Sequence, residues 1–328
     1  MRKYIIKRLL ISVLILFFVS FLIYLLIRMM PMSFVERLAM QKSQQPGAKS
    51  YAEWMAQLNS VYGLGDNVFL GFGKWLFNAV QGNFGDSWQY NMPVLEKFNQ
   101  VIGDSMWLGA VSIVLEFSIA IPIGILAARK QNTITDYIIT VVALIGISLP
   151  EFFFATMVKL AFAVKLNWFE LYGKVSRSHY MMSYWGQVLD IASHYFLPIL
   201  TITIVSIGGM MRYTRTNMLE VLSCDYIRTA RAKGLPEHTV VNRHAFRNTL
   251  IPIVTIFGGM LPGLFSGFFI IEILFQIPGI GFTSYQAIMQ GDIPFSMFYM
   301  VFMSALTLVG TLLADILYAV VDPRVRIS

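Results

Sequence analysis

The chain has 328 residues, of which 56% are hydrophobic and only 13% are charged. Soluble globular domains carry about 25% charged residues, because a polar surface has to cover their apolar core. The composition excludes a soluble fold, so we expect an all-α integral membrane protein with lipid as its outer solvent. The formal net charge is +7, but the lysine and arginine residues lie between apolar runs and not on a polar domain. This distribution argues against nucleic acid as a partner.

The chain starts with basic residues, and a long apolar run follows them. The basic residues lie between Arg2 and Arg8, and the run continues from Leu9 to about Met30. The apolar core of a secretion signal spans only about 7 to 15 residues. We therefore expect a retained spanning helix and not a cleaved signal.

Six apolar segments are long enough to cross a bilayer. A crossing helix needs about 20 residues, because each residue adds about 1.5 Å and the hydrocarbon core is about 30 Å thick. Pro150 lies within the third segment and predicts a kink there. The six predicted spans are Leu9 to Met30, Met106 to Ala128, Tyr137 to Val164, Tyr195 to Met211, Leu250 to Ile273 and Phe295 to Val321.

A long segment rich in aromatic residues separates the first two spans. It contains Trp54, Trp75 and Trp88 among turn residues, and aromatic residues at such density usually pack together. We expect this segment to form a small cap outside the cell. The predicted domains are residues 1–30 with the N-terminus and first span, the extracellular segment 31–103, and the membrane core 104–328, which includes a cytoplasmic loop at 212–249.

Lysine and arginine residues near the span ends predict the orientation, because positive residues stay on the cytoplasmic side. Most of them fall on one side, in the N-terminus, at Arg129 and Lys130, in the loop 212–249 and near the C-terminus. The short loops of the other side hold only Lys165, Lys174 and Arg177. Both termini are therefore expected in the cytoplasm.

The loop between the fourth and fifth spans contains the most informative pattern. Asp225 can cap a short helix that continues to Lys233, and Gly234 then provides a stop that tolerates a positive φ. Pro236 can open a second short helix. The pattern predicts two short helices joined by a sharp turn, just below the membrane.

Such an element suits mechanical coupling between the spans and a soluble motor. Small residues, including Ala230, Ala232 and Gly234, would let a partner surface approach closely, and basic residues would provide charged anchors. A basic loop that touches anionic lipid is the alternative that the residues alone leave open. The candidate coupling residues are Asp225, Arg228, Thr229, Ala230, Arg231, Lys233 and Gly234.

The same loop resembles the coupling-loop signature of permease subunits of binding-protein-dependent ABC importers. Arg228-Thr229-Ala230 occupies the Glu-Ala-Ala positions of that signature, with only the third residue identical, and Gly234 occupies its glycine position. The stretch from Asp225 to Asn248 follows the pattern Asp-Tyr-x-x-Thr-Ala-x-Ala-Lys-Gly and then His-x-x-x-Asn. That pattern is similar to the oligopeptide, dipeptide and nickel branch.

Further motifs extend the resemblance over nearly the whole chain. Pro31-Met32-Ser33 departs from the usual Pro-Gly-Asp-Pro of that branch, and Asp104-Ser105-Met106 departs from its usual Leu-Pro-x-Thr. The matching motifs are Arg8-Leu9-Leu10, Tyr62-Gly63-Leu64, Gly82-Asn83-Phe84-Gly85-Asp86-Ser87, Gly258-Gly259, Glu272-x-x-Phe275-x-x-Pro278-Gly279-Ile280-Gly281, Asp292-x-Pro294, Asp315-x-x-Tyr318 and Asp322-Pro323-Arg324.

The resemblance implies an ABC importer type I-like permease with six transmembrane helices in the bacterial cell membrane. Its implied cargo is oligopeptides or dipeptides, with nickel or a metal chelate as the alternative. The implied partners are a second homologous permease, two cytoplasmic ATPase subunits and an extracellular substrate-binding protein. The sequence has no G-x-x-x-x-G-K-[ST] phosphate loop. ATP and Mg²⁺ are therefore expected on the ATPases, and we expect neither a cofactor nor catalysis in this chain.

Ionisable residues inside the predicted spans are candidates for the solute path. The candidates are Glu116 in the second span and Lys159 in the third, and an interhelical hydrogen bond or ion pair is the competing explanation. The four histidines offer no defensible metal-ligand setting, so no metal site is expected. A carrier driven by an ion gradient could use Glu116 and Asp315, but it leaves the loop around Gly234 unexplained.

Two further expectations concern segments that contain glycine. Gly208-Gly209 and Gly258-Gly259 are expected to permit close packing of helices or a partner interface. The turn Pro278-Gly279-Ile280-Gly281 is expected to re-enter the bundle or pack against it, because backbone at membrane depth must be satisfied within protein.

Overall fold

A computed structural model describes residues 2–29, 32–44, 46–47, 49–62, 66–266 and 268–321, and it contains helices but no strand within these ranges. Pro31, Gly63-Leu64 and the motif Asp322-Pro323-Arg324 lie outside the described residues. The helices in chain order are α1 (Arg2–Arg28), α2 (Met32–Ser43), α3 (Tyr51–Tyr62), α4 (Val68–Val80), α5 (Val94–Arg129), α6 (Ile134–Ser148), α7 (Glu151–Lys159), η1 (Leu160–Lys165), η2 (His179–Met181), α8 (Tyr184–Leu222), α9 (Asp225–Ala232), α10 (Glu237–Thr239), η3 (Val240–Ala245), α11 (Phe246–Ser266), α12 (Phe269–Phe275), α13 (Ile280–Met289) and α14 (Ile293–Val321).

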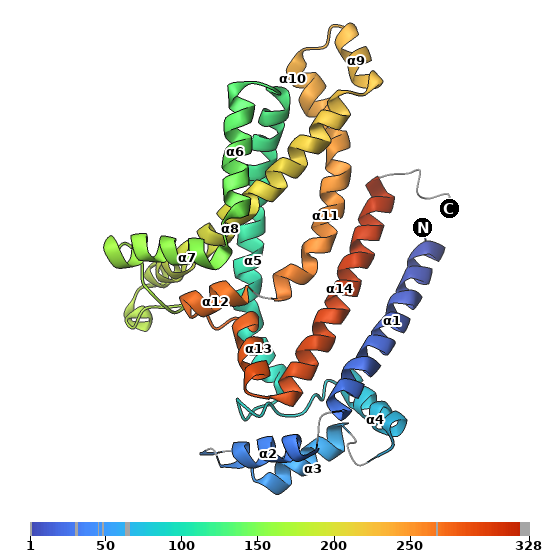
Figure 1. The fold of residues 1–328 in the computed structure, drawn as a ribbon, viewed down its shortest axis with the longest axis vertical. Helices are drawn as coiled ribbons and strands as arrows, with labels where there is room; N and C mark the ends of the chain where they lie inside the picture. The colour runs from blue at the N-terminus through green and yellow to red at the C-terminus, as the bar shows by residue number, and fades with distance from the viewer. Residues whose placement is uncertain are drawn as a thin grey trace.

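The long helices form one elongated bundle. α5 packs against α8 along much of its length, α11 packs against α14, and α1 lies beside α14. Figure 1 shows α9 and α10 at one end of the molecule, called the α9 end below, and α2, α3 and α4 at the opposite end, called the cap end. The start of α1 and the end of α14 point away from the cap end.

Four uninterrupted helical segments among the described residues are long and apolar enough to cross a membrane. Two bent helix pairs pass the same test together: α6 with the α7 and η1 segment, at an angle of 96°, and Pro262–Phe275 with α13, at 81°. Counting each bent pair as one crossing gives six, the number predicted from the sequence. The four uninterrupted segments are Ile5–Leu26, Val94–Arg129, Tyr184–Leu222 and Ile293–Leu317.

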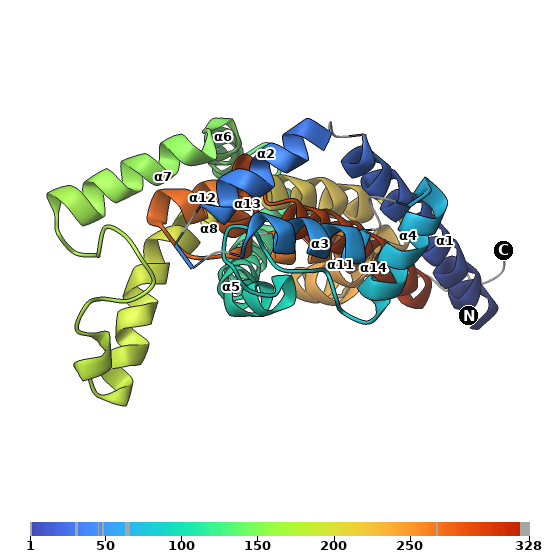
Figure 2. The same ribbon diagram turned by 90° about the horizontal axis from the view of Figure 1, so that it is seen from below.

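The predicted break in the third span is confirmed. α6 ends at Ser148, and α7 begins at Glu151 with Pro150 as its N-cap, at φ −60° and ψ 130°. Proline has no backbone N–H to continue the hydrogen-bond ladder of α6, and its fixed φ suits the start of a new helix. Figure 2 shows that α7 consequently extends sideways from the bundle.

Several helices extend beyond the predicted spans, because hydropathy marks only the apolar part of a helix. α8 has 39 residues, many more than the predicted Tyr195 to Met211, and it starts where the side chain of Ser183 accepts a hydrogen bond from the backbone of Gly186. α5 begins at Val94 and not near Met106, so one helix passes through the predicted domain boundary at residue 103. The predicted fifth span is also divided, since α11 ends at residue 266 and α12 begins at residue 269.

Glycines bring the backbones of neighbouring helices together. A Cβ atom on Gly208 of α8 would lie 2.6 Å from the carbonyl oxygen of Ala143 in α6. A Cβ atom on Gly124 of α5 would lie 2.7 Å from the carbonyl oxygen of Met211 in α8. The prediction of close packing is therefore confirmed at Gly208. A Cβ atom on Gly209 or Gly259 would have no heavy atom within 4 Å, so these two glycines do not bring helices of this chain together.

The segment between α1 and α5 has its own core, which joins it to the bundle. Its largest buried side chains are tryptophans from α3, from α4 and from the turn that follows α4. They pack together with residues at the cap ends of α1 and α14, and this contact holds the cap on the bundle. The buried members of this core are Ile23, Tyr24, Ala39, Trp54, Val61, Phe72, Trp75, Trp88, Ile293 and Met297.

Candidate functional site

The helix α9 is fixed to the bundle by one buried face. Ile227 is fully buried and Ala230 is 6% exposed. Both pack into an apolar cluster with Met218 of α8 and with Val240 and Val241 of η3. Because protein interiors are densely packed, this cluster joins α9 firmly to the end of α8 and to η3.

The backbone of the turn after α9 favours the glycine that the sequence places there. Gly234 has φ +74°, in the left-handed region that residues with a Cβ atom disfavour. Its N–H donates to the Arg231 carbonyl at 2.9 Å, and the Leu235 N–H donates to the Ala230 carbonyl at 3.4 Å. No heavy atom lies within 4 Å of a Cβ built on Gly234. The preference for glycine therefore comes from the backbone conformation and not from lack of space.

Arg231 connects the two short helices of the loop. Its Nε and Nη2 atoms donate to the two carboxylate oxygens of Glu237, at 3.1 and 2.8 Å. This hydrogen-bonded pair lowers the pKa of the Glu237 carboxyl group and raises the pKa of Arg231. Arg231 is expected from the sequence to be a charged anchor for a partner; in the structure it pairs with Glu237 of α10 while 43% of its side chain stays exposed, and its contact with a partner stays a prediction.

The remaining candidate residues of α9 form an exposed face. Asp225 and Arg228 pair at 3.4 Å, with side chains 95% and 73% exposed, and Thr229 and Lys233 are exposed beside them. Of the small residues, Ala232 and Gly234 are exposed, but Ala230 faces the core of this chain. The expectation that Ala230 admits a partner surface is therefore wrong, because helical spacing puts it on the same face as Ile227.

Glu116 lies inside the bundle. Its side chain is buried on the face of α5 that packs inward, 6% exposed, with the buried Ser112 one turn before it. No hydrogen bond or ion pair joins the Glu116 carboxyl group to another described residue. Its assignment to the solute path stays a prediction.

Lys159 lies at the end of α7, covered by two other elements. Its Nζ donates to the carbonyl of Leu274 in α12 and lies 3.7 Å from the ring centroid of Tyr172. The Gly173 N–H donates to the Phe275 carbonyl at 2.9 Å, which holds the same loop against α12. Lys159 thus joins α7, α12 and this loop, and its part in the solute path likewise stays a prediction.

Glu272 is the centre of a buried hydrogen-bond cluster. Its carboxylate accepts from the backbone N–H groups of Phe268 and Phe282, at 3.1 and 2.7 Å, and from the Ser105 hydroxyl at 2.6 Å. Ser105 in turn accepts from the Ile280 N–H at 2.8 Å. The turn before α13 is therefore packed against α5 through Glu272, as the sequence predicted.

A second cluster joins two further motifs. Asp292, fully buried before α14, accepts from the Ser87 hydroxyl, from the Gln89 N–H at 3.1 Å and from the Phe295 N–H at 3.2 Å. Burial raises the pKa of the Asp292 carboxyl group, although these hydrogen bonds act to lower it. At the other end of α14, Asp315 forms an ion pair of 3.2 Å with Arg8 of α1.

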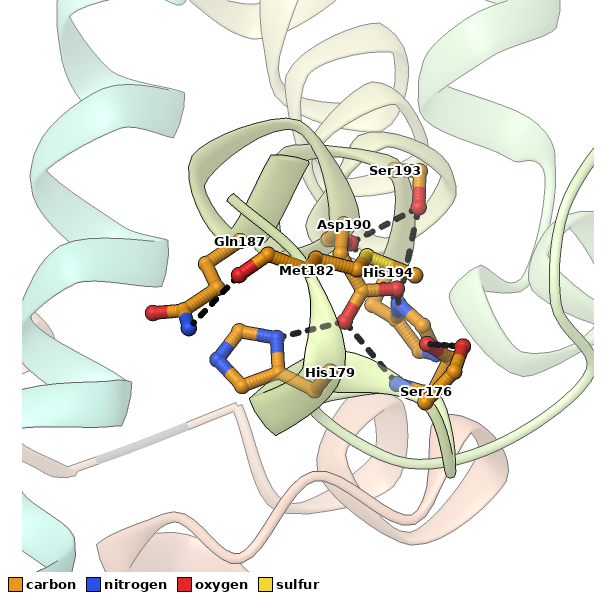
Figure 3. Close-up of polar contacts among 8 residues, drawn as sticks. Ser176, His179, Met182, Gln187, Asp190, Ser193 and His194 are labelled. Carbon is orange, nitrogen blue, oxygen red and sulfur yellow. Dashed lines mark hydrogen bonds and ion pairs between the residues drawn. The ribbon is translucent and has the colours of Figure 1, made fainter. Parts of the chain in front are cut away.

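Two histidines that the sequence left without a role hold the loop between η1 and α8. Figure 3 shows the Asp190 carboxylate between them: it lies 2.7 Å from His179 Nδ1 and accepts from the Ser176 N–H at 3.0 Å. His194 Nδ1 donates to the Asp190 carbonyl at 2.8 Å. These contacts tie the loop to the first turns of α8. Within the described ranges, no group of three or more His, Cys, Asp or Glu side chains is placed to hold a metal ion.

Sequence reasoning missed Ser105 and Asp190, which complete these clusters. Ser105 lies in the stretch Asp104-Ser105-Met106, which departs from a motif of the resemblance, and Asp190 is a single acidic residue among apolar neighbours. Asp104 was also not singled out, yet its carboxylate accepts from Tyr195 at 2.9 Å and lies 2.5 Å from Lys174. The partners of Ser105 and Asp104 lie 167 and 91 residues away in the chain, so no local pattern signals them, and those of Asp190 are brought to it by the fold of the loop before α8.

Comparison with known proteins assigns the family. Residues 120–327 match the model of the binding-protein-dependent transport system inner membrane component. The chain is similar to the oligopeptide transport system permease protein AppB of Bacillus subtilis, at 36% identity over 99% of this chain and 100% of the relative. It is also similar to the dipeptide transport system permease protein DppB of Lactococcus lactis, at 34% identity over 100% of both chains. The chain therefore belongs to the family of inner membrane components of binding-protein-dependent transport systems, as a transport component of an ABC importer.

Proposed function

We propose that this chain is the permease subunit of an ATP-driven importer that translocates oligopeptides or dipeptides into the cell. The observation that carries the proposal is the arrangement of α9: one face is buried against α8 and η3, and the opposite face is exposed at the end of the bundle. A rigid element of this form transmits force from a docked motor to the spans. The full-length similarity to two peptide permeases supports the choice of cargo.

In this proposal the motor belongs to other subunits. The sequence has no phosphate loop of the type G-x-x-x-x-G-K-[ST]. Two cytoplasmic ATPases would bind ATP and Mg²⁺ and dock on the exposed face of α9, around Arg228, Lys233 and Gly234. A second, homologous permease would complete the path, and an extracellular binding protein would deliver the peptide.

The proposed orientation places the α9 end and both termini in the cytoplasm of a bacterial cell. The described residues at the α9 end include Arg129, Lys130 and the basic loop around α9. Positive residues near span ends are retained on the cytoplasmic side. The cap of α2, α3 and α4 would then lie outside the cell, on the side where the binding protein delivers its peptide.

Uptake into vesicles tests this function. The chain would be reconstituted with the subunits that co-purify with it, with ATP enclosed and a labelled dipeptide or pentapeptide supplied outside together with the binding protein. We expect uptake of peptide that needs hydrolysable ATP and that persists when proton and sodium gradients are abolished. Uptake that follows an ion gradient without ATP would contradict the proposal, and uptake of nickel but of neither peptide would contradict the proposed cargo.

A further inference from the structure

Helix α4 has an exposed apolar face, although the helix is too short to cross a membrane. α4 has 13 residues, too few to cross a bilayer, which takes about 20. Phe69, Leu70, Phe77 and Val80 are nevertheless 76%, 67%, 66% and 82% exposed. At 100° per residue, these four side chains fall within one arc of the helix surface. Gly73 lies in the same arc, and a Cβ atom built on it would have no heavy atom within 4 Å.

The opposite face of α4 is buried in the cap. Phe72 is 4% exposed and Trp75 is 1% exposed, and both belong to the core that joins the cap to the bundle. This packing fixes the rotation of α4 about its axis. The exposed arc is therefore a defined face of the cap and not a result of loose packing.

The polar groups of α4 lie along one edge between these two faces. Lys74, the only charged residue of the helix, pairs with Asp66 at 2.6 Å. Asn78, one turn later, donates to the Ser60 carbonyl at 3.3 Å. A helix with a packed face, an apolar face and a narrow polar edge matches the pattern of helices that lie in the plane of a membrane interface.

The depth of α4 is set by its contact with a spanning helix. The ring centroid of Phe72 lies 5.3 Å from that of Phe17 in α1, and Phe69 stacks on Phe21 at 5.9 Å. Both partners belong to the predicted crossing Ile5–Leu26. Phe17 precedes the end of α1 at Arg28 by 11 residues, which is about 16 Å along the helix axis. Figures 1 and 2 both show α4 beside the cap end of α1.

We infer that α4 is an interfacial helix whose face of Phe69, Leu70, Phe77 and Val80 lies in the acyl chains of the leaflet at the cap end. The occupant is lipid, because this face carries no charge and is continuous with the lipid-facing side of α1, where Phe18 and Leu22 are 55% and 57% exposed. In the orientation proposed above, this is the outer leaflet. The inference itself depends only on α1 crossing the membrane, and it stands whatever the cargo is.

Collision accessibility of spin labels tests this assignment in the full chain, reconstituted in phospholipid nanodiscs with its co-purifying subunits. Cys224 is the only cysteine of the chain, so Phe77→Cys and Val80→Cys are each made with Cys224→Ser. The matched control is Ser60→Cys on the exposed side of α3. Each label is measured with oxygen, which concentrates in lipid, and with a water-soluble nickel chelate.

We expect oxygen to relax the labels at residues 77 and 80 several-fold more than the nickel chelate does, with the opposite order at residue 60. A label at residue 77 or 80 that prefers the nickel chelate would overturn the inference, because the face would then lie in water. Low collision rates with both reagents would also overturn it, because a protein partner and not lipid would then cover the face. The two positions are independent, so failure of one variant to fold leaves the other as the test.

Discussion

Gly279, just before α13, and Gly281, within it, lie so close to Glu272 and Phe269 that a side chain at either position would collide with them. A Cβ atom on Gly279 would lie 2.4 to 2.5 Å from the carboxyl group of Glu272, and one on Gly281 would lie 2.9 Å from the Phe269 nitrogen. Gly279 has φ −86° and ψ 177°, which any residue adopts. Glycine is therefore required at residue 279 for space and not for backbone freedom.

We expect Gly279→Ala to lower the free energy of unfolding by about 1 to 3 kcal/mol, the usual cost of forcing an extra methyl group into a packed site. Gly103→Ala is the matched control, because a Cβ atom at that helical position in α5 meets no heavy atom within 4 Å. Thermal unfolding of the purified chain in detergent measures both. Equal unfolding temperatures for Gly279→Ala and the unsubstituted chain would show that Glu272 can move aside.

The long-range partners of the motif residues could not be predicted from one sequence. Glu272 and Asp292 stand in motifs of the family resemblance, but those motifs do not identify the groups that the two carboxylates contact. Their partners Ser105 and Ser87 lie 167 and 205 residues away in the chain, and nothing local records such a pairing. The pairing of Arg231 with Glu237 was not predictable either, because Glu237 follows a turn whose geometry determines whether the two side chains meet.

At the scale of helices, signals for helix breaks were more reliable than signals for helix ends. Pro150 and Gly234 predicted a kink and a sharp turn, because both residues restrict or permit specific backbone angles. The ends of α5 and α8 were not predictable from hydropathy, since their polar extensions are stabilised by contacts with other parts of the chain. The three helices of the cap were anticipated only as a packed aromatic segment.

The side of the membrane on which the junction of α8 and α9 lies can be tested with the native cysteine. Cys224 is partly exposed at the junction of these helices. We expect a membrane-impermeant maleimide to label it in inside-out vesicles and not in right-side-out cells, because the α9 end is proposed to face the cytoplasm. Ser60→Cys combined with Cys224→Ser should give the opposite result, and labelling of Cys224 from outside intact cells would contradict the orientation.

At the scale of the whole molecule, the two ends of the bundle are built for different tasks. The cap end is fixed by the aromatic core and by Asp292, so we expect it to move as one body with the ends of α1 and α14. The α9 end is a short helix mounted on α8 and η3 through Ile227 and Ala230. Densely packed helices respond to force by shifting as rigid elements, so a motor that moves α9 would tilt α8 and α11 against the remaining spans.

The pair Gly234→Val and Gly234→Asn tests this coupling most directly. Valine resists the left-handed conformation at φ +74°, whereas asparagine adopts it readily. Strain of this kind costs about 1 to 3 kcal/mol, enough to lower a coupled rate about tenfold or more. In the reconstituted importer, we expect the Gly234→Val variant to assemble but to take up peptide about tenfold more slowly in the presence of ATP. The Gly234→Asn variant should retain most of the uptake rate. Unchanged uptake with Gly234→Val would contradict the role of this loop in energy coupling.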